Sequence, residues 1–212
     1  MSKKNTNVHI IDHPLIQNKL TMIRNSDTNN LMFRTLLSEI ASLMVFEIFR
    51  DFPTKKVNVV TPLEETTGIK LAKDITLVPI LRAGLGMIEG ILNLIPNATV
   101  GHVGLYRHKK TLQPVEYYSK FPKNIAETKV IVIDPMLATG GSASAAIDFV
   151  KEKKAQDIQF VCLVAAPEGI AKLRTDHPNV PIYTASIDRE LNQQAYIMPG
   201  LGDAGDRIYG TE

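Results

Sequence analysis

The amino-acid sequence predicts an α/β fold with an open, doubly wound, mostly parallel sheet and helices on both faces. Short apolar runs typical of buried strands alternate with stretches of helical spacing downstream of residue 56. Strands that alternate with helices are joined by right-handed crossovers, which favours parallel pairing. The 212 residues contain no internal repeat or low-complexity linker, so a single domain over residues 1–212 is expected.

The elements follow in chain order. An N-terminal helical segment covers about residues 1–52, because apolar residues from Leu31 to Phe52 keep helical spacing behind cap candidates at residues 27–30. A core follows over about residues 57–190. Its apolar runs lie at residues 57–62, 75–81, 98–106, 130–135, 158–166 and 181–187, with helices predicted at 84–95, 141–153 and 168–176. The C-terminal segment, residues 195–212, has neither a helical nor an alternating pattern.

In such sheets ligands bind beyond the carboxyl ends of the strands. The loops after residues 62, 81, 107, 135 and 187 are therefore the candidate positions for a site. The stretch around 107–128 interrupts the alternation with a basic run, a proline and a tyrosine pair. We interpret it as an excursion, which is either a hairpin flap over the site or an ordinary solvated loop.

Composition narrows the classes of partner and compartment. The formal net charge is +2 with both signs mixed along the chain, which argues against nucleic acid or an anionic membrane as a partner. Cys162 is the single cysteine, so no intrachain disulfide can form, and we expect a small core residue in a cytoplasmic protein. Neither a signal peptide nor a membrane span is predicted.

The strongest local motif is VIVIDPMLATGGSASAAIDFV, residues 130–150. It combines a buried strand, an acid at its carboxyl end, a loop of small residues and a helix, which is the order of a phosphate-binding loop. A Walker loop and a G-x-G-x-x-G turn are both lacking, which disfavours ATP and NAD. The alternative for Asp134 is a carboxylate that caps the neighbouring helix.

Two arginines follow predicted strands. Arg82 lies in PILRAGLGM and Arg107 ends GLYRH. A planar guanidinium binds phosphate oxygens bidentately, so the pair could hold one diphosphate. Either arginine alone is more often an ordinary surface residue.

DPMLATGGSA at residues 134–143 resembles the signature of type I phosphoribosyltransferases, and Pro135, in place of a second acid, matches their uracil-specific branch. LRAGLGM, GLYRH and the terminus AYIMPGLGDAGDRIYGTE are similar to segments of the same branch. The resemblance implies transfer of phosphoribose from phosphoribosyl pyrophosphate (PRPP) to uracil, with UMP and diphosphate as products in pyrimidine salvage.

The resemblance also implies which residues form the site. The catalytic residues would be Arg107, Asp134 and Asp203. Uracil would contact Ile197, Gly202, Asp203 and Ala204. PRPP would contact Arg82, Arg107, Asp134, Pro135, Met136, Leu137, Ala138, Thr139, Gly140, Gly141, Ser142 and Asp203. Within this set, Asp134 would accept bonds from the ribose hydroxyls and residues 138–142 would hold the 5′-phosphate.

Cofactor and partner expectations follow. Mg²⁺ would be carried mainly by PRPP itself, and no protein-built metal site is expected because the histidines lack metal-ligand spacing. The resemblance implies a homodimer or a larger homo-oligomer, and GTP as a candidate activator, since GTP activates part of that family. Two rival functions stay open, namely a phosphoribosyltransferase for another base and a regulator that binds RNA or nucleotides as a sensor.

Overall fold

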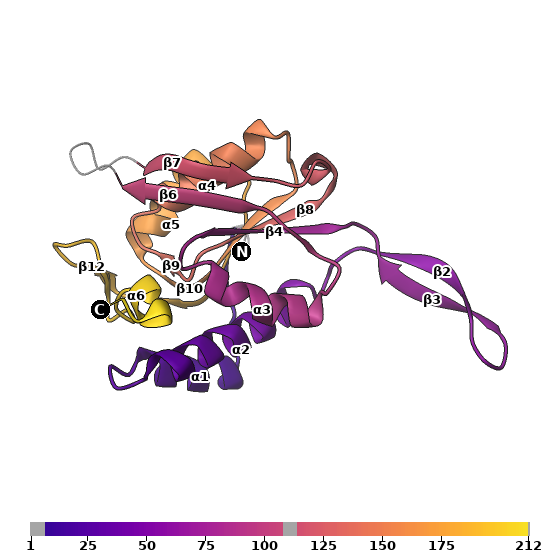
Figure 1. The fold of residues 1–212 in the computed structure, drawn as a ribbon, viewed down its shortest axis with the longest axis horizontal. Coiled ribbons are helices and arrows are strands. Elements are labelled where there is room, and N and C mark those ends of the chain that lie inside the picture. The colour runs from indigo at the N-terminus through magenta and orange to yellow at the C-terminus, as the bar shows by residue number, and fades with distance from the viewer. Residues whose placement is uncertain (1–6, 108–113, 212) are drawn as a thin grey trace, which may run out of the picture.

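A computed structural model describes residues 7–107 and 114–211 and shows a central, mostly parallel sheet (Figure 1). The strand order is β1-β11-β10-β8-β4-β6-β7, with β5 added to β4 and β9 added to β10. Only the β6–β7 pair of this sheet is antiparallel. The predicted α/β class is confirmed. The strands are β1 Val8–Ile10, β4 Ile75–Leu81, β5 Thr99–Val100, β6 His102–Arg107, β7 Pro114–Lys120, β8 Lys129–Ile133, β9 Met136–Leu137, β10 Ile158–Ala165 and β11 Ile182–Ile187.

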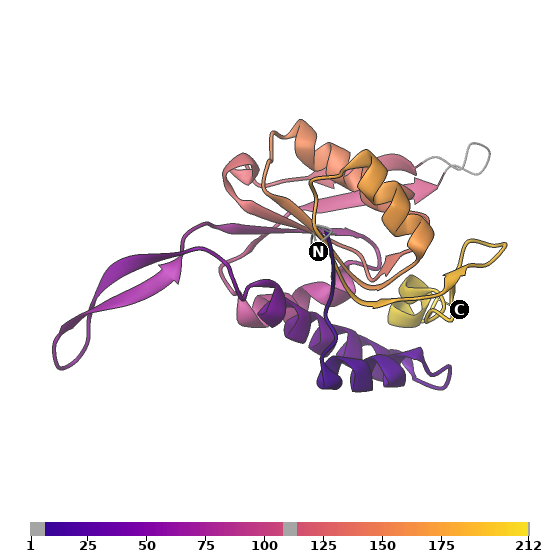
Figure 2. The ribbon, with the colours of Figure 1, turned by 180° about the vertical axis from the view of Figure 1, so that it is seen from behind.

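Helices cover both faces of the sheet, as the alternation predicts (Figures 1 and 2). On one face lie α1 Pro14–Arg24, α2 Asn30–Ile48, α3 Leu85–Leu94 and the short α6 Ala204–Tyr209. On the other lie α4 Gly141–Glu152 and α5 Pro167–Asp176. The three helices predicted in the core region are confirmed to within one residue at their ends.

The N-terminal face is built around α2. Asn29 caps this helix by accepting a hydrogen bond from the Met32 N–H at 2.9 Å. Its buried positions repeat every three or four residues, which turns one apolar stripe toward α1, α3 and the sheet. They are Phe33, Leu36, Leu37, Ile40, Ala41, Met44 and Val45. The 31–52 prediction is therefore confirmed with a C-terminus four residues earlier.

The opposite face packs α4 and α5 onto β8 and β10. All eight residues of β10 are buried, because strands covered on both faces are apolar throughout. Cys162 in β10 is fully buried, and burial raises the pKa of its thiol to about 12. It is a core residue, as expected, and not a nucleophile.

The prediction for residues 57–62 as part of the core was wrong. β2 (Thr54–Val60) and β3 (Glu65–Leu71) form an antiparallel hairpin that projects from the body (Figure 1). We call it the arm. Most of its residues are exposed, including Leu63 at 96%. The prediction failed because apolar β-forming residues give the same sequence pattern in an arm as in a core. The loop after residue 62 therefore is not part of the predicted site edge, and it lies far from that edge (Figure 1).

Two further segments differ in detail. The 98–106 run divides into β5 and β6 around Gly101. The C-terminal segment, predicted to lack a helical pattern, contains α6, which Asp203 caps by accepting from the Asp206 N–H at 3.0 Å. A helix of six residues is too short to display a period.

The excursion near 107–128 is a hairpin in its first half. β6 and β7 pair antiparallel, and a 3₁₀ turn at Ile125–Glu127 follows. Residues 108–113, which include His108, Lys109 and Lys110, lie outside the described residues. Whether the hairpin acts as a flap stays a prediction.

Candidate active site

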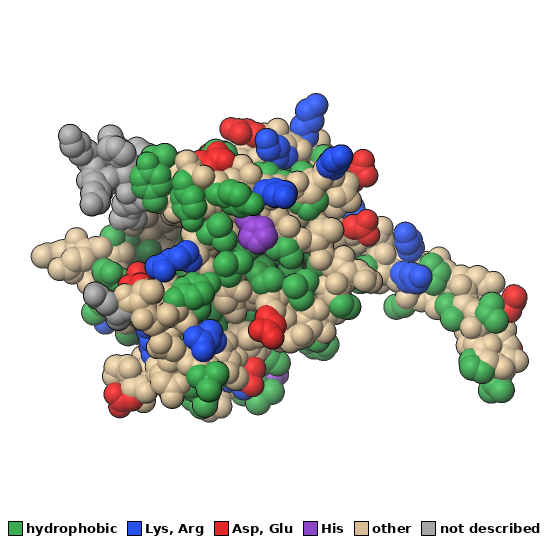
Figure 3. All heavy atoms as spheres, viewed as in Figure 1, with side chains coloured by type: hydrophobic (Ala, Val, Ile, Leu, Met, Phe, Trp, Pro, Cys, Tyr) green, Lys and Arg blue, Asp and Glu red, His purple; other side chains and the backbone are tan. Residues whose placement is uncertain are grey.

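The predicted site edge lies where β4, β6, β8 and β11 end. Residues after β4, β8 and β11 approach the C-terminal segment there, on the side of the molecule away from the arm (Figure 1). The surface is hollowed between the β6–β7 hairpin and the C-terminal segment (Figure 3). A Cβ on Gly84, after β4, would meet the Ile133 carbonyl at 2.5 Å, so the loop that carries Arg82 packs directly against the end of β8.

Asp134 follows β8 and is half-buried at this edge. One carboxylate oxygen accepts a hydrogen bond from the Met136 N–H at 3.3 Å. The pKa of Asp134 is raised to about 7, mainly by desolvation and to a smaller extent by the negative charge of Asp203, against the lowering effect of that bond. The first residue of α4 follows Gly140, so Asp134 is not the cap of that helix. Asp134 therefore titrates near neutral pH beside a second carboxylate.

The loop from Ala138 to Ser142 leads directly into α4. Gly140 has φ +81° and precedes the first turn of the helix without a side-chain cap. A Cβ there would meet the Gly169 carbonyl at 2.8 Å, so only glycine allows both this conformation and this approach. The N–H groups of the first turn of a helix lack intrahelical partners, which suits them to an anion.

Pro135 and Leu137 of the predicted PRPP set are buried, and Met136 between them is half-buried. The Pro135 carbonyl accepts from the N–H groups of Leu163 and Val164, and the Leu137 carbonyl accepts from that of Ala166. Leu137 is 1% exposed in the core beneath α4. These residues anchor the loop to β10, whereas residues 138–142 lie at its open end.

The two predicted arginines end neighbouring strands. Arg82 follows β4, and Arg107 is the last residue of β6. The Arg82 guanidinium lies 3.5 Å from the Asp206 carboxylate and 5.6 Å from the centre of the Tyr209 ring. Tyr209 also donates a hydrogen bond to the Arg82 carbonyl at 3.2 Å. Arg82 thus joins the strand edge to α6, a contact that sequence spacing did not indicate.

The predicted base-binding residues lie together in the C-terminal segment, but not equally exposed. β12 (Glu190–Leu191) and β13 (Ile197–Met198) form a small antiparallel pair that starts it. The side chains of Ile197 and Ala204 are buried in the core beneath α2. Gly202 and Asp203 are exposed, and Gly202 has φ +77°. Of the four residues, Gly202 and Asp203 are the two whose surface is exposed at the site edge of the sheet.

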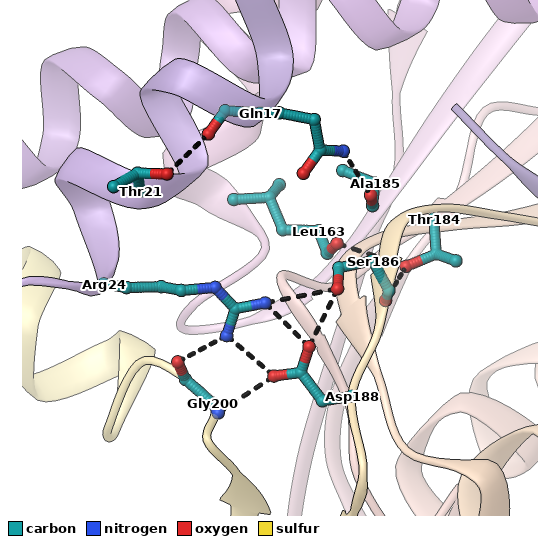
Figure 4. A network of polar contacts seen from close by, with 9 residues as sticks. All are labelled: Gln17, Thr21, Arg24, Leu163, Thr184, Ala185, Ser186, Asp188 and Gly200. Atoms are coloured by element: carbon teal, nitrogen blue, oxygen red, sulfur yellow. Dashed lines mark hydrogen bonds and ion pairs between the residues drawn. The ribbon is translucent and has the colours of Figure 1, made fainter. Parts of the chain in front are cut away.

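Sequence reasoning missed the residues that hold this segment in place (Figure 4). Arg24, at the end of α1, pairs with Asp188, which follows β11. The same guanidinium donates to the Gly200 carbonyl at 2.6 Å. Arg207 donates to the Leu201 carbonyl at 2.8 Å and to the Asn25 carbonyl at 2.6 Å. These partners are more than a hundred residues apart in several cases, so no local motif marks them.

Among the described residues, no group of three or more histidine, cysteine or carboxylate side chains could hold a metal ion. Nor does that part of the chain contain a helix long and apolar enough to cross a membrane.

The parallel sheet, the acid after β8 and the glycine loop that opens α4 define a phosphoribosyltransferase of type I. Solved structures agree. The chain superposes on the AQ2163 protein of Aquifex aeolicus with a TM-score of 0.92, at 36% identity and 97% and 99% coverage of the two chains. The adenine phosphoribosyltransferase of Trypanosoma brucei, at 15% identity, shares the fold with a TM-score of 0.59 over 96% and 92%.

Sequence comparison identifies the branch. The family model for uracil phosphoribosyltransferase matches residues 10–211. The uracil phosphoribosyltransferase of Acidovorax sp. strain JS42 is 56% identical over 98% of this chain and 100% of its own length. That of Bacillus velezensis is 57% identical over 97% and 99%. The chain belongs to the uracil phosphoribosyltransferase family, and it is a pentosyltransferase.

Proposed function

We propose that the protein transfers the phosphoribosyl group of PRPP to uracil, with UMP and diphosphate as products, as a step of pyrimidine salvage. The observation that carries the proposal is the meeting of two motifs at one edge. Asp134 and the loop that opens α4 suit a ribose phosphate, and Asp203 of the C-terminal segment is near enough to raise the pKa of Asp134. The donor and the base can therefore meet between β8 and the C-terminal segment.

The donor binds through Asp134 and the loop after it. As a carboxylate, Asp134 accepts hydrogen bonds from the ribose hydroxyls, and residues 138–142 bind the 5′-phosphate with backbone N–H groups. Support comes from the conformation of Gly140 and from the half-buried position of Asp134. Pro135, Met136 and Leu137 contribute by fixing the loop to β10.

Arg82 and Arg107 bind the diphosphate group. Arg82 is well exposed, with 57% of its side chain accessible, and its ion pair with Asp206 is long at 3.5 Å. An exposed pair of this kind contributes little free energy, so the guanidinium can turn toward a diphosphate at little cost. Arg107, Asp134 and Asp203 are the proposed catalytic residues, because they would surround the anomeric carbon and the leaving group.

Mg²⁺ would accompany PRPP. The two carboxylates of the site, Asp134 and Asp203, fit a hard cation that is held mainly by phosphate oxygens and waters. When bound, the ion supplies charge neutralisation for the departing diphosphate. The protein residues orient the two substrates, and a ring nitrogen of uracil attacks the anomeric carbon with inversion through an oxocarbenium-like transition state. The bond from that carbon to diphosphate breaks, and the proton of the attacking nitrogen passes to solvent.

Uracil binds to the backbone of the C-terminal segment. Its ring offers two carbonyl acceptors and an N–H donor in one plane, which exposed backbone groups can complement. The exposed Gly202 and Asp203 are proposed to contact the base directly. Ile197 and Ala204, whose side chains are buried, are proposed to contact it through their backbone.

We also propose that the protein is a homodimer or a larger homo-oligomer. The arm exposes apolar side chains, among them Val60 at 75% and Ile69 at 71%. An isolated two-stranded hairpin is marginally stable in water, so a second copy of the chain is the natural cover for it. Sedimentation analysis tests this, and a monomer at micromolar concentration would contradict it. Activation by GTP and a cytoplasmic location are proposed from the family resemblance, and GTP titration of the activity tests the former.

One assay distinguishes the candidate functions. Purified protein is mixed with Mg²⁺, PRPP and radiolabelled uracil, and UMP is separated by chromatography. Orotate, adenine, guanine and hypoxanthine serve as competing bases. UMP formation with preference for uracil supports the proposal. Preference for another base would make the protein a different phosphoribosyltransferase, and no nucleotide product from any base would favour a sensor.

A further inference from the structure

We propose that Arg24 and Asp188 are positioning residues for the base, which hold the backbone of residues 197–203 in the conformation that binds uracil. This inference rests on the proposed role of that segment in uracil binding. Neither residue belongs to the predicted site, and Asp188 is 6% exposed. Their effect on the reaction would act through Gly200.

The contacts converge on a single glycine (Figure 4). The Gly200 N–H donates to one carboxylate oxygen of Asp188 at 2.9 Å, and the Gly200 carbonyl accepts from the Arg24 guanidinium at 2.6 Å. Arg24 also grips both oxygens of Asp188, at 2.7 and 2.6 Å. Both backbone polar groups of Gly200 are thus fixed to one charged pair, which leaves little freedom for the peptide units on either side.

Gly200 has a backbone conformation and a close backbone contact that a residue with a Cβ could not adopt. Its φ is +62°, and a Cβ there would meet the Ile197 carbonyl at 2.1 Å. The segment bends on either side of this residue, at Pro199 after β13 and at the exposed Gly202. Any rotation of the Gly200 peptide units therefore changes the direction of the backbone groups that follow.

Asp188 is held by more than Arg24. Ser186 donates to its Oδ1 at 2.8 Å, and its own N–H donates to the Ala165 carbonyl at 2.8 Å. These contacts join the pair to the ends of β10 and β11, which belong to the sheet. Residues 197–203 are thereby anchored to the same sheet that carries the loop after Asp134.

Stability alone is a poor explanation for this pair. A buried ion pair loses so much hydration that apolar residues of similar volume often serve stability equally well. This pair instead specifies geometry, because two hydrogen bonds fix Arg24 to Asp188 and two more fix the pair to the backbone of Gly200. Accurate geometry is what recognition of a small planar base requires.

The test compares two arginines that tie the C-terminal segment to the N-terminal helices. Arg24→Met removes the guanidinium that reaches Gly200, and Arg24→Lys keeps the charge without the planar fork. Arg34→Met is the matched control, because Arg34 donates to the Ile208 carbonyl in α6 and not to residues 197–203. For each variant, KM for uracil and for PRPP is measured with the other substrate saturating, together with PRPP affinity by calorimetry and the melting temperature.

We expect Arg24→Met to raise KM for uracil by about tenfold or more, with PRPP affinity within about threefold of the parent. For Arg24→Lys, the KM for uracil should lie between the values of the parent and of Arg24→Met. Arg34→Met should leave the KM for uracil and the PRPP affinity within about threefold of the parent. If Arg24→Met does not fold, Arg24→Lys and Asp188→Asn provide the same comparison.

An unchanged KM for uracil overturns the inference, as does an equal loss for both substrates or an equal effect of Arg34→Met. Each of these results, with a parent enzyme that makes UMP, refutes the positioning role alone. A parent enzyme that makes no UMP from uracil refutes the proposed function and this inference with it.

Discussion

Replacing Asp134 with asparagine should stabilise the folded protein at neutral pH while it removes activity. Burial raises the pKa of this carboxyl from 3.8 to about 7, so the native site holds a proton that the unfolded chain releases. Asparagine keeps the shape and can still accept the Met136 N–H bond, but it carries no charge to desolvate. The cost of the ionised group is thus removed together with its function.

The size and sign follow from proton linkage. Between pH 3.8 and about 7 the folded state binds more protons at Asp134 than the unfolded state does, so its stabilising contribution falls as pH rises. This contribution is fully present below pH 3.8, the pKa in the unfolded chain, and it is lost as the pH rises through about 7, the pKa in the folded protein. The whole difference is worth about 4 kcal/mol. Relative to the difference at pH 3, the free energy of unfolding of Asp134→Asn should therefore exceed that of the parent by about 2 kcal/mol at pH 5 and by about 4 kcal/mol at pH 8.

Urea unfolding at fixed protein concentration, at intervals from pH 5 to pH 8, measures this directly. The diagnostic quantity is the difference in free energy of unfolding between variant and parent, because other titrating groups cancel in it. A difference that stays constant over this range would mean that Asp134 is ionised throughout, and the desolvation argument would be refuted. PRPP affinity should fall in the same variant, since an amide accepts ribose hydroxyl bonds less strongly than a carboxylate.

Three other predictions concern the reaction. EDTA should stop UMP formation and added Mg²⁺ should restore it, because diphosphate leaves as concentrated negative charge; full activity in excess chelator would exclude the metal. Arg107→Lys should lower kcat or raise KM for PRPP, since lysine loses the planar fork, and parent-like kinetics would make Arg107 a surface residue. Ala204→Leu should abolish uracil turnover while PRPP affinity by calorimetry stays within a few-fold. Because Ala204 is 3% exposed, the melting temperature of the variant must be recorded to detect a loss of stability. Retained activity would refute the base-site assignment.

Much of the fold could be predicted because its signals are local. The uninterrupted apolar run of β10 indicates a strand covered on both faces, and the periodic stripe of α2 indicates a helix with one buried side. The burial of the arm was predicted wrongly, because the sequence of a strand does not show which other elements pack against that strand. α6 was missed because a cap at Asp203 and a C-terminal Gly210 with φ +68° define it, rather than any period.

The residues proposed to bind the donor are also close together in the sequence. Asp134 and residues 138–142 are contiguous, and strand, acid, glycine loop and helix are consecutive in the chain. Arg82 could be placed at a strand end, but its contact with α6 could not, since that contact joins residues from the two halves of the sequence. The protonation behaviour of Asp134 also needed the structure, because burial is its largest cause.

The base half depends on contacts between the two ends of the chain. Arg24 reaches Gly200, Arg207 reaches Asn25, and Arg34 reaches Ile208, so three guanidinium groups donate to backbone carbonyls across this junction. The buried side chains of Ile197, Leu201, Ala204 and Ile208 pack this segment into the core, but the glycines between them add freedom to the unfolded chain. Guanidinium groups from both ends of the chain supply directed hydrogen bonds at this junction. The segment proposed to present its backbone to uracil is therefore tied to the N-terminal helices by these bonds as well as by packing.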